Sequence, residues 1–238
     1  MRRENFIRNG LRWLLSSVAS RIAPQRVKRA AEMRYWRERW EAEGQAFENA
    51  HYRKLMLGMA GEEDASFVEG KVVADFGCGP RGSLCWATEA KMRIGIDVLA
   101  DAYAEFNVGA QNMRYVCSTE NAVPLPSDSI DTLFTINAMD HVVHFEVMCR
   151  DIVRILAPGG QFIGSFNLDE PRTPAEPQTL TEDRVKRCLL DQLEVTSYRT
   201  ATRGPDGNAY RNCFDGTPAP SSGPRFLWVR ATKPPAAC

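Results

Sequence analysis

The chain lacks the cysteine spacing of a structural zinc site and the long apolar run of a membrane protein. Its seven cysteines are scattered, at positions 78, 85, 117, 149, 188, 213 and 238, and no two form a Cys-x-x-Cys pair. We therefore predict no bound metal and a reducing, cytoplasmic location. No run reaches the roughly 18 apolar residues that cross a bilayer. The uncharged stretch at 13–20 is also short for a signal peptide.

The chain also has no formal net charge, because its 30 basic and 30 acidic residues cancel. The balance hides an asymmetry, since residues 1–40 carry a net charge of +8 and the remainder carries −8. An acidic body is a poor surface for nucleic acid. We therefore expect no DNA partner, and an RNA partner is disfavoured.

The N-terminal sixty residues have the pattern of helices rather than strands. Apolar residues recur at steps of three and four along 7–22, and two more helical stretches are predicted at 26–42 and 45–59. We expect residues 1–60 to form a basic helical extension that covers residues 61–238 as a lid or a packed decoration. Contact of this arm with a membrane surface, and oligomerisation, remain open alternatives.

From residue 71 the pattern changes to alternating strands and helices. Strands are predicted at 72–76, 93–97, 113–117, 132–136, 161–166, 193–199 and 225–231, and helices at 84–90, 100–107, 144–156 and 181–189. This alternation predicts an α/β fold: a Rossmann-like, doubly wound, mostly parallel seven-stranded sheet with helices on both faces. The stretch 202–223, rich in Gly, Pro, Asn and Asp, is predicted to be a loop insertion before a hairpin return.

The most informative stretch is 72–84, VVADFGCGPRGSL, in which a buried strand passes into a glycine-rich turn. Gly77, Gly79 and Gly82 match the G-x-G-x-x-G pattern of dinucleotide-binding folds, which would indicate a nicotinamide oxidoreductase. Asp75 argues against that interpretation. A carboxylate there suits a ligand with positive charge and with amine or hydroxyl donors, and it suits a pyrophosphate poorly.

Five stretches in order resemble the class I S-adenosylmethionine-dependent methyltransferases, particularly the small-molecule group called type 11. They are VVADFGCGPRG at 72–82, GID at 95–97, STENAVPLPSDSID at 118–131, INAMDHV at 136–142 and RILAPGGQFIGS at 154–165. The inserted Arg81 departs from the commoner form of the first motif. The resemblance implies the fold predicted above and S-adenosylmethionine as the cofactor.

The resemblance also implies a set of cofactor-binding residues. The first motif surrounds the methionine part of the cofactor, and the second strand ends in the acid that holds the ribose hydroxyls. Either of two neighbouring polar residues, with the glutamate preferred, would meet the adenine amine. The implied residues are Asp75, Gly77, Cys78, Gly79, Asp97, Val98, Thr119, Glu120 and Asn137. For Asp97 the alternative is a backbone cap for the segment that begins at Leu99.

Methyl transfer needs acceptor, methyl carbon and sulfur held in line, and a hydroxyl or ammonium acceptor also needs a base. Asp140 and His141 follow the fourth predicted strand, at the sheet edge where ligands bind in such folds. His51 lies on the predicted lid helix and is the third catalytic candidate. The alternatives are that His141 packs beside the adenine and that His51 packs against Tyr52.

Three residues are predicted to contact the substrate, namely Trp36, Tyr52 and Glu176. The alternatives are an aromatic core for Trp36 and an ordinary exposed loop acid for Glu176. These residues fall in short runs at 35–44, 51–52 and 176–178 that resemble a subset of bacterial family members, and this resemblance implies no particular substrate.

We therefore predict transfer of a methyl group to an oxygen or nitrogen of a small molecule. One alternative is a catalytically inactive relative that binds the cofactor or a partner, and a weaker one is the nicotinamide oxidoreductase. The fourth strand ends in INAMDH rather than Asn/Asp-Pro-Pro-Tyr, which disfavours a flipped nucleic-acid base as acceptor.

Overall fold

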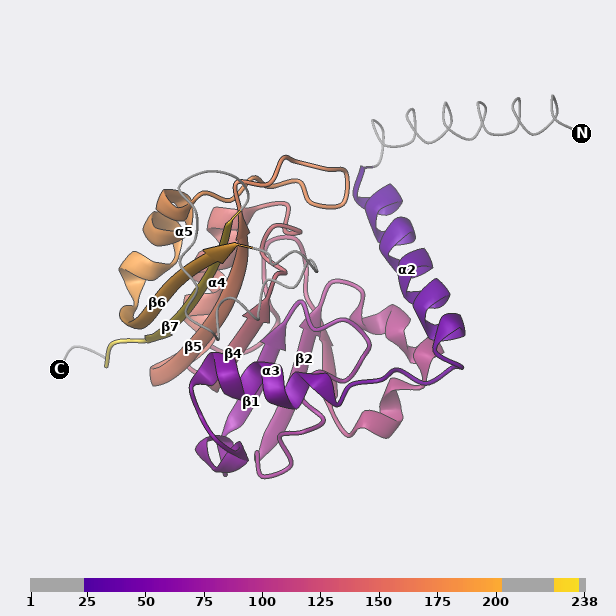
Figure 1. Ribbon diagram of the computed structural model, residues 1–238, viewed down its shortest axis with the longest axis horizontal. Coiled ribbons are helices and arrows are strands. Elements are labelled where there is room, and N and C mark those ends of the chain that lie inside the picture. The colour runs from indigo at the N-terminus through magenta and orange to yellow at the C-terminus, as the bar shows by residue number, and fades with distance from the viewer. Residues whose placement is uncertain (1–23, 203–224, 236–238) are drawn as a thin grey trace, which may run out of the picture.

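A computed structural model describes residues 24–202 and 225–235, with a seven-stranded sheet at the centre (Figure 1). The strand order is β3-β2-β1-β4-β5-β7-β6. The strands are β1 (Val72–Phe76), β2 (Met92–Asp97), β3 (Arg114–Cys117), β4 (Ile130–Ile136), β5 (Leu156–Leu168), β6 (Glu194–Thr202) and β7 (Arg225–Thr232). Strands β1 to β5 pair in parallel, and β7 runs antiparallel to both β5 and β6. The predicted mostly parallel Rossmann-like sheet is confirmed.

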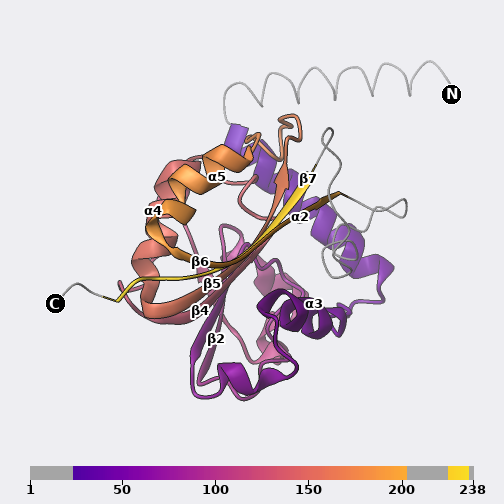
Figure 2. The same ribbon diagram turned by 60° about the vertical axis from the view of Figure 1, so that its left-hand side comes forward.

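Helices cover both faces of the sheet. They are α2 (Pro24–Ala42), α3 (His51–Ala60), α4 (Phe145–Ile155) and α5 (Glu182–Cys188), with short 3-10 helices η1 (Ala65–Val68), η2 (Ala100–Phe106), η3 (Val108–Gln111) and η4 (Leu190–Gln192). Figure 2 shows α4 and α5 on one side of the sheet and α2 and α3 on the other. This arrangement explains why the central strands β1 and β4 are buried along most of their length rather than on one face only.

Two details of the sequence prediction were wrong. The helix expected at 84–90 is a series of turns, closed by bonds such as Cys85 N to Gly82 O (3.0 Å) and Ala87 N to Leu84 O (3.1 Å). Arg93 donates to the carbonyl of Cys85 (3.1 Å), a tertiary contact that holds this segment against β2. The helix expected from residue 45 begins only at His51.

Strand β5 is longer than predicted because it continues through the Pro-Gly-Gly turn. The pairing changes from Ile130–Leu156 to Thr132–Gln161, so the residues between form a bulge. Gly159 lies there with φ +76°.

The core has one apolar cluster on each face. Under α4 and α5 it includes the α4 residues Phe145, Met148, Cys149, Ile152 and Ile155, which recur at helical spacing. Under α3 it includes Met56, Met59 and, from the sheet, Phe134, Phe226 and Trp228.

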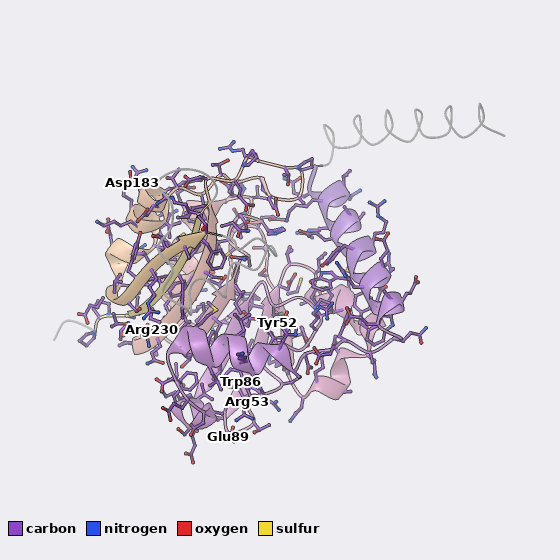
Figure 3. The ribbon with its side chains drawn as sticks, in the orientation of Figure 1. Tyr52, Arg53, Trp86, Glu89, Asp183 and Arg230 are labelled. Carbon is purple, nitrogen blue, oxygen red and sulfur yellow. The ribbon has the colours of Figure 1, made fainter. Side chains whose placement is uncertain are left out.

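Helix α3 is fastened to β7 at its C-terminal end. The Trp228 indole donates to the carbonyl of Met59 (3.1 Å), and Arg230 donates to the carbonyl of Ala60 (2.5 Å). Figure 3 shows Arg230 at this end of α3 and Tyr52 toward the other. The predicted domain boundary at residue 60 stays a prediction. With that boundary, α3 belongs to the N-terminal extension, although it packs on the central sheet.

A third cluster holds α2 against η2, with Met33 and the rings of Trp36 and Trp40. The ring centroid of Trp40 lies 5.0 Å from that of Phe47 and 5.8 Å from that of Phe106. The predictions of a helix at 7–22 and of a loop insertion at 202–223 fall almost wholly outside the described residues. Among the described helices, none combines the length and the apolar character needed to cross a membrane.

Candidate active site

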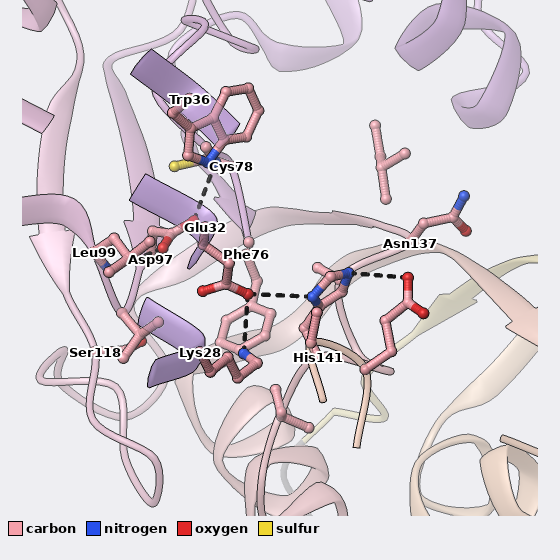
Figure 4. A pocket seen from close by; sticks show the side chains of 18 of the residues that line it. Lys28, Glu32, Trp36, Phe76, Cys78, Asp97, Leu99, Ser118, Asn137 and His141 are labelled. Carbon is pink, nitrogen blue, oxygen red and sulfur yellow. Dashed lines mark hydrogen bonds and ion pairs between the residues drawn. The ribbon is translucent and has the colours of Figure 1, made fainter. Parts of the chain in front are cut away.

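A cavity of about 590 Å³ opens at the carboxyl ends of the parallel strands, next to α2 (Figure 4). Strand β1 lies between β2 and β4, so the strand order reverses at this point, where ligands bind in open α/β sheets. Most of the predicted site residues line the cavity, namely Trp36, Tyr52, Gly77, Cys78, Gly79, Asp97, Val98, Thr119, Glu120, Asn137, His141 and Glu176. Asp75, Asp140 and His51 do not.

The glycine turn and Asp97 are tied together. Asp97 Oδ2 accepts from the Gly79 amide (3.1 Å), and Oδ1 accepts from the Leu99 amide (2.9 Å). The backbone cap considered as an alternative for Asp97 is therefore present. Asp97 also lines the cavity. A carboxylate has about four lone-pair sites, so acceptor capacity remains for a diol after these two backbone bonds. Burial raises the pKa of this carboxyl above its usual range, despite the two backbone donors.

Asp75 lies behind the turn rather than in the cavity wall. It is buried, and its Oδ2 accepts a hydrogen bond from the Ser83 hydroxyl, whereas Oδ1 has no hydrogen-bond partner among the described residues. Burial raises the pKa of Asp75 to about 7. A direct contact of Asp75 with the cofactor is therefore not supported by its position, and a supporting role for the turn fits better.

We expect the stability gain from Asp75→Asn to increase with pH. The pKa of Asp75 is raised from 3.8 to about 7, so the folded protein keeps a proton that the unfolded chain has already lost. The carboxyl thus destabilises the fold increasingly between about pH 4 and pH 7, by at most ~1.4 kcal/mol per pH unit. Urea unfolding of both proteins across this range measures the difference. A difference that does not change with pH contradicts the raised pKa, and Asp191→Asn, at an exposed site, is the control.

On the adenine side, the two candidate residues have different contacts. The Thr119 hydroxyl accepts from the amides of Asn121 (3.2 Å) and Ala122 (2.9 Å), so it closes its own turn. Glu120 pairs with Arg29 of α2 at 3.0 Å. The preference for Glu120 as the ligand of the adenine amine stays a prediction.

A second group of side chains, which we call the acceptor-side cluster, comprises Glu32, Asp140, His141 and Glu176. His141 Nδ1 lies 3.3 Å from Glu32 Oε1, and its Nε2 lies 3.8 Å from Glu176 Oε1. Figure 4 shows Glu32 reaching His141 from α2, with Lys28 on its other side (3.0 Å).

Charge and burial shift the pKa values of this cluster. Burial lowers the pKa of His141, but the hydrogen bond to Glu32 and the charge of Asp140 outweigh it, so the pKa is raised above its ordinary value. Burial also raises the pKa of Asp140. For Glu32, burial raises the pKa, but His141 and Lys28 together lower it below its usual range.

The EPQ run at 176–178 holds the loop that carries His141. The Gln178 side chain donates to the carbonyls of Val142 (3.1 Å) and Val143 (2.9 Å), and the backbone N–H of Gln178 donates to the carbonyl of Asp140 (3.3 Å). Glu176 of the same run is the residue that faces His141.

Arg81, the residue inserted in the first motif, links the glycine turn to the N-terminal segment. Its guanidinium pairs with Glu43 and donates to the carbonyl of Glu48 (3.1 Å). It also lies over the ring of Phe47, at 5.1 Å from the centroid. The insertion therefore fixes the turn relative to the segment after α2.

His51, the third catalytic candidate, does not line the cavity. Its ring is half-exposed, lies 3.3 Å from Glu48 and packs on Tyr52, with ring centroids 4.3 Å apart. The packing alternative fits His51, whereas Tyr52 lines the cavity. We therefore withdraw His51 as a catalytic candidate.

Sequence reasoning missed three polar residues of α2 that line the cavity, namely Lys28, Glu32 and Tyr35. The first two lie four apart and share a helix face with Trp36. That spacing was visible in the sequence, but the cavity that this face meets was not.

Comparisons with known proteins agree with this geometry. The family described as "Methyltransferase domain" matches residues 74–164, which run from β1 into β5. A curated relative, the sterol 24-C-methyltransferase of Pneumocystis carinii, is 26% identical over 123 residues. The alignment covers 47% of this chain and 30% of the relative, so the chain spans under a third of that protein.

Residues 74–164 thus match a methyltransferase family, and the chain resembles the class I S-adenosylmethionine-dependent methyltransferases.

Solved structures share the fold of this chain at low identity. The [4+2]-cyclase SpnF has a TM-score of 0.57 at 16% identity, covering 79% of this chain and 82% of that one. Geranyl diphosphate methyltransferase in complex with S-adenosylmethionine has a TM-score of 0.57 at 15% identity, covering 76% and 85%. The YcgJ protein of Bacillus subtilis has a TM-score of 0.55 at 17% identity, covering 77% and 98%.

The family's cofactor, S-adenosylmethionine, fits the residues present. A Cβ at Gly77 would lie 2.1 Å from Ala138 Cβ, and one at Gly79 would lie 2.7 Å from the Trp36 ring, so only glycine leaves the turn this close to its surroundings. Asp97, half-buried beside the turn, offers a carboxylate acceptor on the cavity wall that suits ribose hydroxyls.

Proposed function

We propose that this methyltransferase transfers the methyl group of S-adenosylmethionine to an oxygen or nitrogen atom of a small organic acceptor. The observation that carries the proposal is that Gly77, Gly79 and Asp97 line one continuous cavity with three members of the acceptor-side cluster, Glu32, His141 and Glu176. A cofactor held at the glycine turn and Asp97 would present its sulfonium toward the acceptor-side cluster.

Within this cavity, we assign separate roles to the residues that bind the cofactor and to those that contact the acceptor. Gly77 and Gly79 let the backbone approach the methionine part of the cofactor, and Asp97 holds the ribose. The rings of Trp36 and Tyr52 bound the acceptor space, together with Glu176. Holding the acceptor heteroatom in line with the methyl carbon and sulfur is the main source of acceleration.

The reaction transfers one methyl group and releases one proton from the acceptor. The acceptor heteroatom forms a bond to the methyl carbon as the carbon–sulfur bond breaks, leaving a neutral thioether. The acceptor's proton passes to a basic group, and we assign this role to the acceptor-side cluster, whose Glu32 and His141 line the cavity.

Calorimetric titration tests the cofactor assignment. We expect S-adenosylhomocysteine to bind with one-to-one stoichiometry and NADH to give no saturable heat. The reverse result would overturn the proposal in favour of the oxidoreductase.

Transfer of a labelled methyl group to pooled small metabolites then tests catalysis. Incorporation into a compound of low mass supports an enzyme acting on small molecules. Cofactor binding without any incorporation, across pools that include alcohols, phenols and amines, supports the inactive relative instead.

A further inference from the structure

We propose that Asp140, His141 and Glu176 form a site for a divalent transition-metal cation, such as Mn²⁺, on the acceptor side of the cavity. Each residue offers one ligand atom, and the three atoms lie within 4.8 Å of one another. That spacing is compatible with three bonds of about 2.0–2.2 Å to one ion after small side-chain adjustments. The cysteine pattern predicted no metal, and it bears only on thiolate sites.

The strongest sign of a ligand is a buried oxygen without a partner. Asp140 is only 4% exposed, and its Oδ1 has no hydrogen-bond partner among the described residues. An unpaired buried carboxylate oxygen is costly, and a cation would satisfy it. Its other oxygen, Oδ2, accepts from Asn167 Nδ2 at 3.3 Å, and this hydrogen bond orients the carboxylate.

The other two ligands are held in the same way, each by one atom. His141 Nδ1 contacts Glu32 Oε1 (3.3 Å), which leaves Nε2 toward Glu176. Glu176 Oε2 accepts from the Thr173 hydroxyl (3.2 Å), which leaves Oε1 toward His141. Metal-bound histidines commonly donate their second ring N–H to a carboxylate, and metal-bound carboxylates are themselves hydrogen-bonded.

The charges suit a divalent ion. Lys28 pairs with Glu32 at 3.0 Å, so this carboxylate is already balanced. Two carboxylates, Asp140 and Glu176, and a neutral imidazole then remain for a charge of +2. One nitrogen and two carboxylate oxygens favour Mn²⁺, Fe²⁺ or Zn²⁺ over Ca²⁺, which prefers an all-oxygen shell.

Three protein ligands leave coordination positions open. His141 and Glu176 line the cavity, so these positions face the space assigned to the acceptor. The identity of the further ligand rests on the proposed function. An acceptor with two adjacent oxygen donors, such as a catechol or a hydroxy acid, would complete the coordination shell of the metal.

Electron paramagnetic resonance titration of the full chain with Mn²⁺, without cofactor or acceptor, tests the site. We expect saturable binding of one ion, weakened at least about tenfold in His141→Ala, in Glu176→Gln and in the isosteric Asp140→Asn. Circular dichroism establishes that each variant is folded. His144→Ala, an exposed histidine of the same loop, is the matched control and should leave the affinity unchanged.

Other results would overturn the proposal. Without saturable Mn²⁺ binding, or with binding that survives in His141→Ala and Glu176→Gln, the cluster is an ion-pair network of the protein alone. If Asp140→Asn fails to fold, the two surface-accessible variants decide the question. Titration of the same sample with S-adenosylhomocysteine separates the two hypotheses: Mn²⁺ binding without nucleoside binding contradicts only the proposed function, and the converse contradicts only the metal site.

Discussion

Gly77→Ala is expected to destabilise the protein by about 2–5 kcal/mol and to abolish binding of S-adenosylhomocysteine. Gly77 has φ +75°, a conformation that costs an alanine roughly 1–2 kcal/mol. The added Cβ would also lie 2.1 Å from Ala138 Cβ, and overpacking of this kind typically costs another ~1–3 kcal/mol. Urea unfolding and calorimetry measure the two effects.

The double variant Gly77→Ala with Ala138→Gly is the matched test of the packing part. Removing the Ala138 methyl relieves the contact but leaves the backbone strain, so we expect part of the lost stability to return. Ala138→Gly alone is the reference for the cost of the second change. A double variant no more stable than Gly77→Ala would show that the contact with Ala138 is not the cause.

Asp97→Ala is expected to weaken cofactor binding by roughly 1–3 kcal/mol, about 5- to 150-fold, the scale for hydrogen bonds to a charged group. The carboxylate accepts from Gly79 and Leu99, so its removal loosens the glycine turn as well as deleting an acceptor for the ribose. Calorimetry with S-adenosylhomocysteine measures the loss, and Asp191→Ala, at an exposed acid, is the control.

A ribose analogue separates the two roles of Asp97. In the unaltered protein, 2′-deoxy-S-adenosylhomocysteine should bind more weakly than the parent compound. In Asp97→Ala the two compounds should bind alike, because the group that distinguishes them is gone. An undiminished preference for the hydroxyl in that variant would remove Asp97 from the ribose site and leave it as a turn anchor only.

The order of strands along the chain was predictable because each strand has its own local signal. Val72–Phe76 is a short apolar run ahead of glycines, and its bounds agree with β1 residue for residue. The segment at 84–90 shows where local signals fail. Its apolar spacing suits a helix, but Arg93 and the turn after Gly82 hold it in another conformation, and these contacts come from tertiary structure.

The gathering of the proposed cofactor residues at one cavity was also predictable. Asp97, Val98 and Asn137 directly follow or end parallel strands, and such ends meet at one edge of the sheet. The acceptor half was not predictable to the same degree. Glu32 and His141 are 109 positions apart, and no rule of spacing indicates that their side chains meet.

The sequence by itself determined the parallel sheet, the glycine turn and the acid of the second strand, because strand periodicity and turn chemistry act between neighbouring residues. Only the tertiary structure decided that His51 faces solvent while Glu32 reaches His141, and that Asp140 keeps one buried oxygen unpaired. Those outcomes depend on how α2 and the loop held by Gln178 pack over the sheet edge, and packing between distant segments leaves no local pattern.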